Sequence, residues 1–110
     1  MSYRIHITKI AEQDLNSAAD YIEQVLFNPQ AADDLLDETE IQIQKLSYYP
    51  AKYPLVDDPV LKVQGIRFVP VKNYLVFYLI SEPVKTIYIV RFLYARRNWV
   101  YILKQGMPLE

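Results

Sequence analysis

Apolar and polar residues first alternate along the chain and then recur with a helical period. Between Tyr3 and Thr8 the alternation has the two-residue period of a strand with one buried face. From about residue 9 to residue 26, apolar residues recur three and four positions apart, with acidic residues between them. This spacing predicts an amphipathic helix. Thr8 is expected to be its N-cap, because a hydroxyl can accept a hydrogen bond from the first turn.

A second helix begins close behind the first. Asn28 followed by Pro29 is typical of a helix start, with a capping side chain before a proline at the first helical position. An apolar stripe then continues to Leu46, and Phe27 is expected to pack back onto the first turn. Because the turn between the two helices is very short, they are predicted to form an antiparallel hairpin.

Strand-like segments dominate the second half of the chain. Tyrosines and prolines end the second helix and open an irregular connection to about Gln64. Segments 66–71, 74–80 and 86–94 are separated by short linkers and predict an antiparallel meander. Pro70 indicates that the first segment lies at a sheet edge, and the third, apolar on both faces, is expected to be central. Helical spacing returns in residues 96–103, with Trp99 expected to anchor that helix.

The predicted order of elements is β-α-α-β-β-β-α, which describes an α+β fold. We expect an antiparallel-rich sheet with the helical hairpin packed on one face, in a single domain that covers residues 1–110. Little sequence is left to cover the opposite face. That face is therefore expected to stay open and to offer tyrosine and arginine side chains to a partner.

Composition excludes several kinds of site. The 110 residues contain no cysteine, which excludes disulfides, thiolate metal sites and cysteine nucleophiles. The single histidine, His6, has no matching ligands near it in the sequence, so no metal site is expected. No apolar run approaches the roughly 20 residues that cross a bilayer. We therefore expect a cytoplasmic protein with no membrane partner and no cofactor.

Charge is segregated along the chain although the formal net charge is only −1. Residues 10–45 carry nine acidic residues against a single base, Lys45. Residues 46–110 carry nine basic residues against four acidic ones. An anionic partner is therefore expected to meet the second half of the chain.

Three ordered motifs resemble the RelE/ParE superfamily of toxins. The chain opens with a short strand followed by Ala11-x-x-Asp14-Leu15. Gly65-Ile66-Arg67 precedes residues 71–78 (VKNYLVFY), and residues 90–98 (VRFLYARRN) follow as a strand-to-helix junction. Each motif alone is weak, but their order and spacing over residues 3–103 are similar to those of the superfamily and closer to its ParE-like branch.

This resemblance implies the toxin component of a bacterial type II toxin–antitoxin system. Such a toxin inhibits growth and is neutralised by a co-encoded antitoxin whose C-terminal segment wraps around it. ParE-like toxins act by binding DNA gyrase, which is the expected target. The alternative is a RelE-like, ribosome-dependent and metal-free mRNA endonuclease. A third possibility is a relative that binds partners without inhibiting growth.

Two departures from the RelE-like pattern bear on the target. Leu75 stands where such nucleases usually place an arginine, and Tyr94 stands where related nucleases often carry a histidine. Metal-free RNA cleavage needs a general base, cations around the phosphate and a general acid. Tyrosine, with a reference pKa of about 10, is a poor base. The gyrase target is favoured for these reasons, and whether the protein is an enzyme stays open.

Candidate site residues come mainly from the basic second half of the chain. If the protein is an endoribonuclease, the catalytic residues are expected to be Arg67, Arg96, Arg97 and Tyr94. The residues expected to bind a partner or RNA are Arg67, Tyr74, Tyr78, Arg91, Arg96, Arg97 and Tyr101. Structural alternatives remain open for the arginines. Arg67 can pair with an acid of the helices, and Arg91 can form a partly buried ion pair. Arg96 and Arg97 can be a solvated surface pair.

Overall fold

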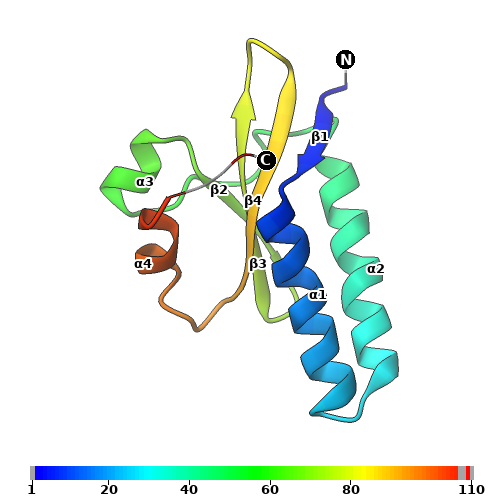
Figure 1. Ribbon diagram of the computed structural model, residues 1–110. Coiled ribbons are helices and arrows are strands. Elements are labelled where there is room, and N and C mark those ends of the chain that lie inside the picture. Colours follow the sequence, from blue (N-terminus) through cyan, green and yellow to red (C-terminus); the bar gives the residue numbers. More distant parts are fainter. Residues whose placement is uncertain (1, 107–108, 110) are drawn as a thin grey trace.

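The structure, a computed structural model, describes residues 2–106 and 109 (Figure 1). The elements are β1 (Arg4–Ile7), α1 (Lys9–Gln24), α2 (Pro29–Leu46), α3 (Pro59–Val63), β2 (Arg67–Val71), β3 (Tyr74–Ser81), β4 (Thr86–Tyr94) and α4 (Trp99–Lys104). The α+β class and the order of the strands and long helices are as predicted. The short helix α3 was not predicted. The helix α4 begins later than expected, so Arg96 and Arg97 lie in the loop before it.

The four strands form one mixed sheet in the order β1-β4-β3-β2. β2 pairs with β3, and β3 with β4, in antiparallel orientation, whereas β1 runs parallel to β4. The central position of β4 and the edge position of β2 are confirmed. Pro70 is exposed on β2, and the loop before the strand pairs with its outer edge through a bridge between Leu55 and Arg67.

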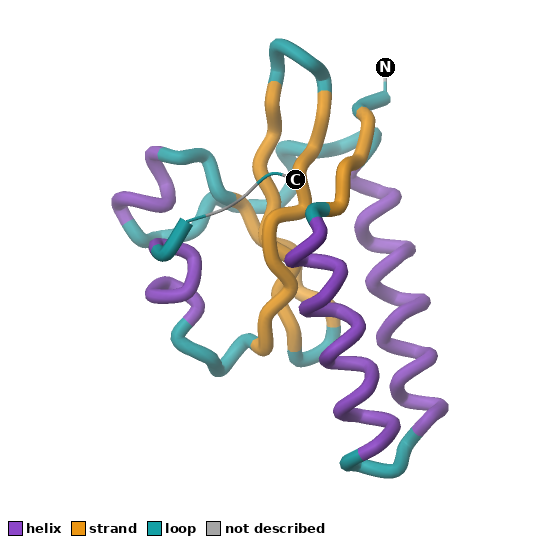
Figure 2. The backbone as a smooth tube through the Cα atoms, in the orientation of Figure 1, coloured by secondary structure: helices purple, strands orange, loops and turns teal. Residues whose placement is uncertain are grey.

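The helical hairpin packs on one face of the sheet, as Figure 2 shows. Both predicted caps are present: the Thr8 side chain accepts a hydrogen bond from the Ala11 N–H at 3.2 Å, and the Asn28 side chain accepts one from the Ala31 N–H at 3.1 Å. The hairpin and this face share a core that includes Leu35, Leu46, Val76, Tyr78, Ile87, Ile89 and Phe92. None of the helices in the described residues is long and apolar enough to span a membrane.

The opposite face of the sheet is covered, so the expectation of an open face was wrong. A second core joins Phe77, Val90 and Leu93 of the sheet to Leu61 of α3 and Leu103 of α4. Trp99 anchors α4 as expected, since its ring centroid lies 5.2 Å from that of Phe77.

The helix α3 explains part of this covering. Asp58 caps it by accepting hydrogen bonds from the Val60 and Leu61 N–H groups, both at 3.2 Å, and Pro59 occupies its first position. Asp58 also meets Lys104 of α4 at 3.1 Å. Asp58-Pro59 is thus the same kind of start signal as Asn28-Pro29, but a five-residue helix is too short to show a hydrophobic period.

The turn between α1 and α2 also differs from the prediction. Phe27 does not pack onto the first turn of α2, because its side chain is 84% exposed. Its backbone has a φ of 53°, in the left-handed region that bulky residues rarely adopt. The short turn requires this conformation and directs the ring into solvent.

Candidate functional site

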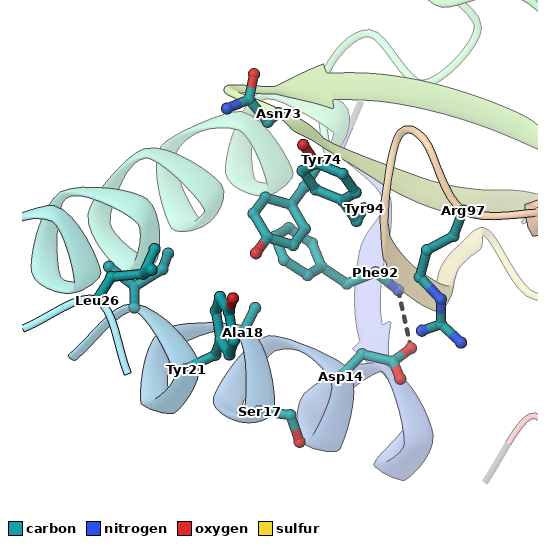
Figure 3. A pocket seen from close by; sticks show the side chains of 11 residues that line it. Asp14, Ser17, Ala18, Tyr21, Leu26, Asn73, Tyr74, Phe92, Tyr94 and Arg97 are labelled. Carbon is teal, nitrogen blue, oxygen red and sulfur yellow. Dashed lines mark hydrogen bonds between the residues drawn. The ribbon is translucent and has the colours of Figure 1, made fainter. Parts of the chain in front are cut away.

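A groove of about 860 Å³ lies between α1 and the ends of β3 and β4 (Figure 3). Its α1 wall consists of Asp14, Ser17, Ala18, Tyr21, Ile22 and, just beyond the helix, Leu26. Its sheet wall consists of Asn73, Tyr74, Phe92, Tyr94 and, from the loop before α4, Arg97. The lining combines an apolar floor with a carboxylate and a cation, which suits a partner segment of mixed character.

The groove exists because β1 covers only half of β4. Their pairing ends at Ile7 opposite Ile89, after which Thr8 turns the chain into α1. The Thr8 hydroxyl donates to the Ile89 carbonyl at 2.9 Å, and the Phe92 N–H farther along this edge donates to the Asp14 carboxylate at 3.1 Å. Side chains of α1 therefore replace a neighbouring strand along the uncovered part of β4.

Asp14 and Arg91 form a two-point ion pair at this edge. Arg91 Nε lies 2.7 Å from Asp14 Oδ2, and Arg91 Nη2 donates to Asp14 Oδ1 at 2.9 Å. Both side chains are only 14% exposed. The alternative of a structural ion pair for Arg91 is therefore confirmed. The two donors it gives to Asp14 are not free for an external partner.

Three aromatic rings form the floor at the end of the sheet. The rings of Tyr74 and Phe92 are stacked with centroids 4.9 Å apart, and Tyr94 meets Tyr74 edge-on at 5.5 Å. Burial raises the pKa of Tyr74, and the neighbouring phenols of Tyr94 and Tyr21 add to this effect. A raised pKa makes this phenol a weaker candidate for a general base at neutral pH.

The predicted cations of the junction lie on the surface. Arg96 and Arg97 are exposed in the loop between β4 and α4, and Figure 3 shows Arg97 at the same end of the groove as Asp14, on the opposite wall. The Asn98 side chain caps α4 by accepting a hydrogen bond from the Tyr101 N–H at 3.3 Å. Tyr101 is exposed on α4, outside the groove lining. Arg97, Tyr94 and Tyr74 are therefore the predicted residues that the structure brings together.

Arg67 and Tyr78 lie elsewhere and hold a loop against the sheet. Arg67 Nη1 donates to the Tyr53 carbonyl at 2.6 Å, and the Tyr78 hydroxyl donates to the Pro50 carbonyl at 2.6 Å. Tyr78 has 0% exposure, so its predicted role in binding a partner is not supported by its position. Burial raises the pKa of Tyr78 to about 12, partly offset by the charge of Arg67. Arg67 thus bonds to backbone carbonyls rather than to an acid of the helices.

None of the residues of the α1 wall was among the predicted site residues. The helical period places Ala18, Ile22 and Leu26 on the apolar face of the helix. Ala18 and Ile22 do pack against the core, and all three also line the groove. Periodicity identifies the face of a helix that meets the sheet, but it does not show where that sheet ends. Tyr21 of this helix is 52% exposed beside the groove and is the residue that could have pointed to this wall.

Several solved structures have a fold similar to this one. The chromosomal ParDE toxin–antitoxin system from P. aeruginosa matches with a TM-score of 0.69 and 18% identity, over 86% of this chain and 98% of that chain. The toxin–antitoxin complex RelBE2 from Mycobacterium tuberculosis matches with a TM-score of 0.60 and 18% identity, over 86% of this chain and 99% of that one. A mutant of the E. coli toxin RelE in the free state matches at 0.63 and 10% identity, over 93% of each chain.

The sequence itself identifies the family. The family model described as the ParE toxin of the type II toxin–antitoxin system parDE matches residues 5–99. No curated protein matches the sequence significantly. Because the family match covers most of the chain, the protein belongs to the ParE toxin family of type II toxin–antitoxin systems.

Proposed function

We propose that this protein is a cytoplasmic toxin that inhibits growth by binding DNA gyrase, without catalysing a reaction, and that a co-encoded antitoxin neutralises it. The position of Arg67 carries this proposal. Arg67 is paired with Tyr78, whereas Tyr94 is paired with Tyr74, four positions away along β3. At about 3.3 Å per residue, that separation is roughly 13 Å. The four residues expected of an endonuclease therefore do not converge on one phosphate.

The groove also lacks a well-suited general base. Its carboxylate, Asp14, is bonded to Arg91 and to the Phe92 N–H. No histidine is among the lining residues, and His6 lies on β1 with its ring 5.6 Å from that of Tyr88. Burial raises the pKa of Tyr74 rather than lowering it. These features support a binding surface more than a site for proton transfer.

The groove is the surface that we assign to the antitoxin. Solved structures with this fold include toxin–antitoxin complexes, which supports an antitoxin as partner. The wall formed by Ala18, Ile22 and Phe92 suits the apolar face of a partner segment, and Arg97 suits an acidic group beside it.

A supercoiling assay with purified components tests the target. Relaxed plasmid, ATP and DNA gyrase are incubated with increasing amounts of the protein, with and without its antitoxin. We expect supercoiling to be inhibited and the antitoxin to restore it. Normal supercoiling in the presence of excess folded protein would rule out gyrase as the target.

The alternative function is mRNA cleavage, which the position of Arg97 and Tyr94 in the same groove favours. It predicts that induced expression cuts ribosome-bound mRNA within minutes, and that Arg96→Ala and Arg97→Ala restore growth. Mapping of transcript ends after induction distinguishes mRNA cleavage from inhibition of gyrase. Intact transcripts during growth arrest support gyrase as the target, whereas new ends that vanish in the arginine variants support cleavage.

A further inference from the structure

The tip of the helical hairpin lies away from the strands of the sheet (Figures 1 and 2). Exposed apolar side chains form a patch at this tip. It consists of Tyr21, Val25, Leu26 and Phe27, each of which is more than 50% exposed. We call these four residues the hairpin-tip patch. Tyr21 and Leu26 also border the groove, but Val25 and Phe27 are not part of its lining. The tip is therefore a surface that continues beyond the groove.

Folding of the chain does not explain the phenylalanine at position 27. Its φ of 53° brings the Cβ atom close to the backbone, a conformation that glycine and asparagine adopt more easily. Its ring is 84% exposed and so gains little packing within this chain. The turn itself is closed by the backbone, since the Asn28 N–H donates to the Ile22 carbonyl at 3.1 Å. A strained and exposed aromatic residue indicates a role outside the fold.

The charge around the patch restricts what can cover it. Exposed acidic residues lie beside it on both helices, Asp20 and Glu23 on α1 and Asp33 and Asp34 on α2. Residues 10–44 contain no lysine or arginine. A second copy meeting tip to tip, an anionic membrane and a nucleic acid would each be repelled by this negative surface. A protein with a basic border around an apolar pocket is complementary to it.

We propose that the hairpin-tip patch docks into an apolar pocket bordered by lysine or arginine side chains on the target protein, with Phe27 as the anchor. This proposal rests on the proposed function, in which the target is DNA gyrase. It assigns the groove to the antitoxin and the tip to the target, with Tyr21 and Leu26 at the border of the two surfaces. Exposed aromatic anchors of this kind carry much of the binding energy in protein interfaces.

Binding of purified DNA gyrase to the immobilised protein tests the proposal. The variant is Phe27→Asn, because asparagine tolerates a positive φ and removes the apolar ring. The control is Val63→Asn, which removes an apolar side chain that is 88% exposed on α3. We expect Phe27→Asn to weaken binding by at least about tenfold without lowering the midpoint of thermal unfolding, and Val63→Asn to leave binding unchanged.

The outcomes separate this proposal from the proposed function. The tip is not the docking surface if the wild-type protein and Phe27→Asn bind gyrase equally well, or if Val63→Asn weakens binding as much as Phe27→Asn does. In both cases gyrase remains the target. If the wild-type protein does not bind gyrase, the proposed target fails and this proposal falls with it. An association rate that does not decrease between about 50 mM and about 500 mM salt would contradict the basic border.

Discussion

The substitution Asp14→Ala removes the acceptor that holds β4 to α1. The carboxylate accepts two hydrogen bonds from Arg91, at 2.7 and 2.9 Å, and one from the Phe92 N–H at 3.1 Å. Removing one partner of a buried ion pair costs about 3–5 kcal/mol, whereas exposed pairs contribute about 1 kcal/mol or less. Because both side chains are 14% exposed, the pair lies nearer the buried case. We expect the free energy of unfolding to decrease by about 3 kcal/mol.

Urea denaturation of four proteins measures this contribution: the wild type, Asp14→Ala, Arg91→Met and the double variant. Replacing both ionic partners is expected to cost less than the sum of the single changes, because the double variant leaves no charge without a partner. The coupling energy is expected to be on the order of 2 kcal/mol. Asp14→Asn is the matched control. It keeps an acceptor for the Phe92 N–H and should lose about half as much stability as Asp14→Ala.

A second measurement separates the edge hydrogen bond from the ion pair. Exchange of the Phe92 amide hydrogen is expected to be faster in Asp14→Ala than in Arg91→Met, because only the first change removes its acceptor. Single-variant costs that add to within about 0.5 kcal/mol would refute the coupling between the two side chains. Equal exchange rates at Phe92 in the two variants would refute the role of Asp14 at the strand edge.

Two further predictions concern the loop held by Tyr78 and Arg67. Burial raises the pKa of Tyr78 to about 12 in the folded protein, so ionisation of this phenol opposes folding. The wild-type protein should keep its full stability below the ordinary tyrosine pKa near 10. Its free energy of unfolding should decrease by roughly 2–3 kcal/mol as the pH rises toward 12. Tyr78→Phe should lack this step in urea denaturation at a series of pH values, and the same pH dependence in both proteins would contradict it. Arg67→Ala should lower the free energy of unfolding by about 1–2 kcal/mol, because the Tyr53 carbonyl loses its hydrogen-bond donor. The same variant should still bind gyrase. Loss of binding in a folded variant would show that Arg67 contacts the target.

Local signals in the sequence predicted most of the fold. The caps at Thr8 and Asn28 depend on residues within one helical turn, so a single sequence contains all the information that they need. Pro70 correctly predicted that its strand lies at the edge of the sheet. Segment 86–94, apolar on both faces, was correctly predicted to be a central strand. The covering of the second face was not predicted. It depends on contacts of α3 and α4 with each other and with the sheet, and all three antiparallel strands separate these two short helices in the sequence.

The site was harder to predict because a bulge changes which residues of β4 face the helices. Phe77 pairs with Arg91 and Tyr78 with Ile89, so Val90 is the extra residue. Ile89 and Phe92 therefore share the core beneath the hairpin, although they lie three positions apart in a strand whose side chains otherwise alternate. Alternation alone cannot predict such a shift. It also cannot predict that Arg91 will meet a carboxylate of α1.

The groove itself follows from the place where β1 ends. Thr8 both caps α1 and bonds through its hydroxyl to the Ile89 carbonyl, so the chain leaves the sheet at this residue. A β1 strand longer by two residues would continue alongside Val90 and Arg91 and displace the start of α1. The edge of β4 would then be paired, and Asp14 could not reach the Phe92 N–H. The early turn at Thr8 is thus the local event that leaves β4 uncovered and places a carboxylate, aromatic rings and Arg97 around one groove.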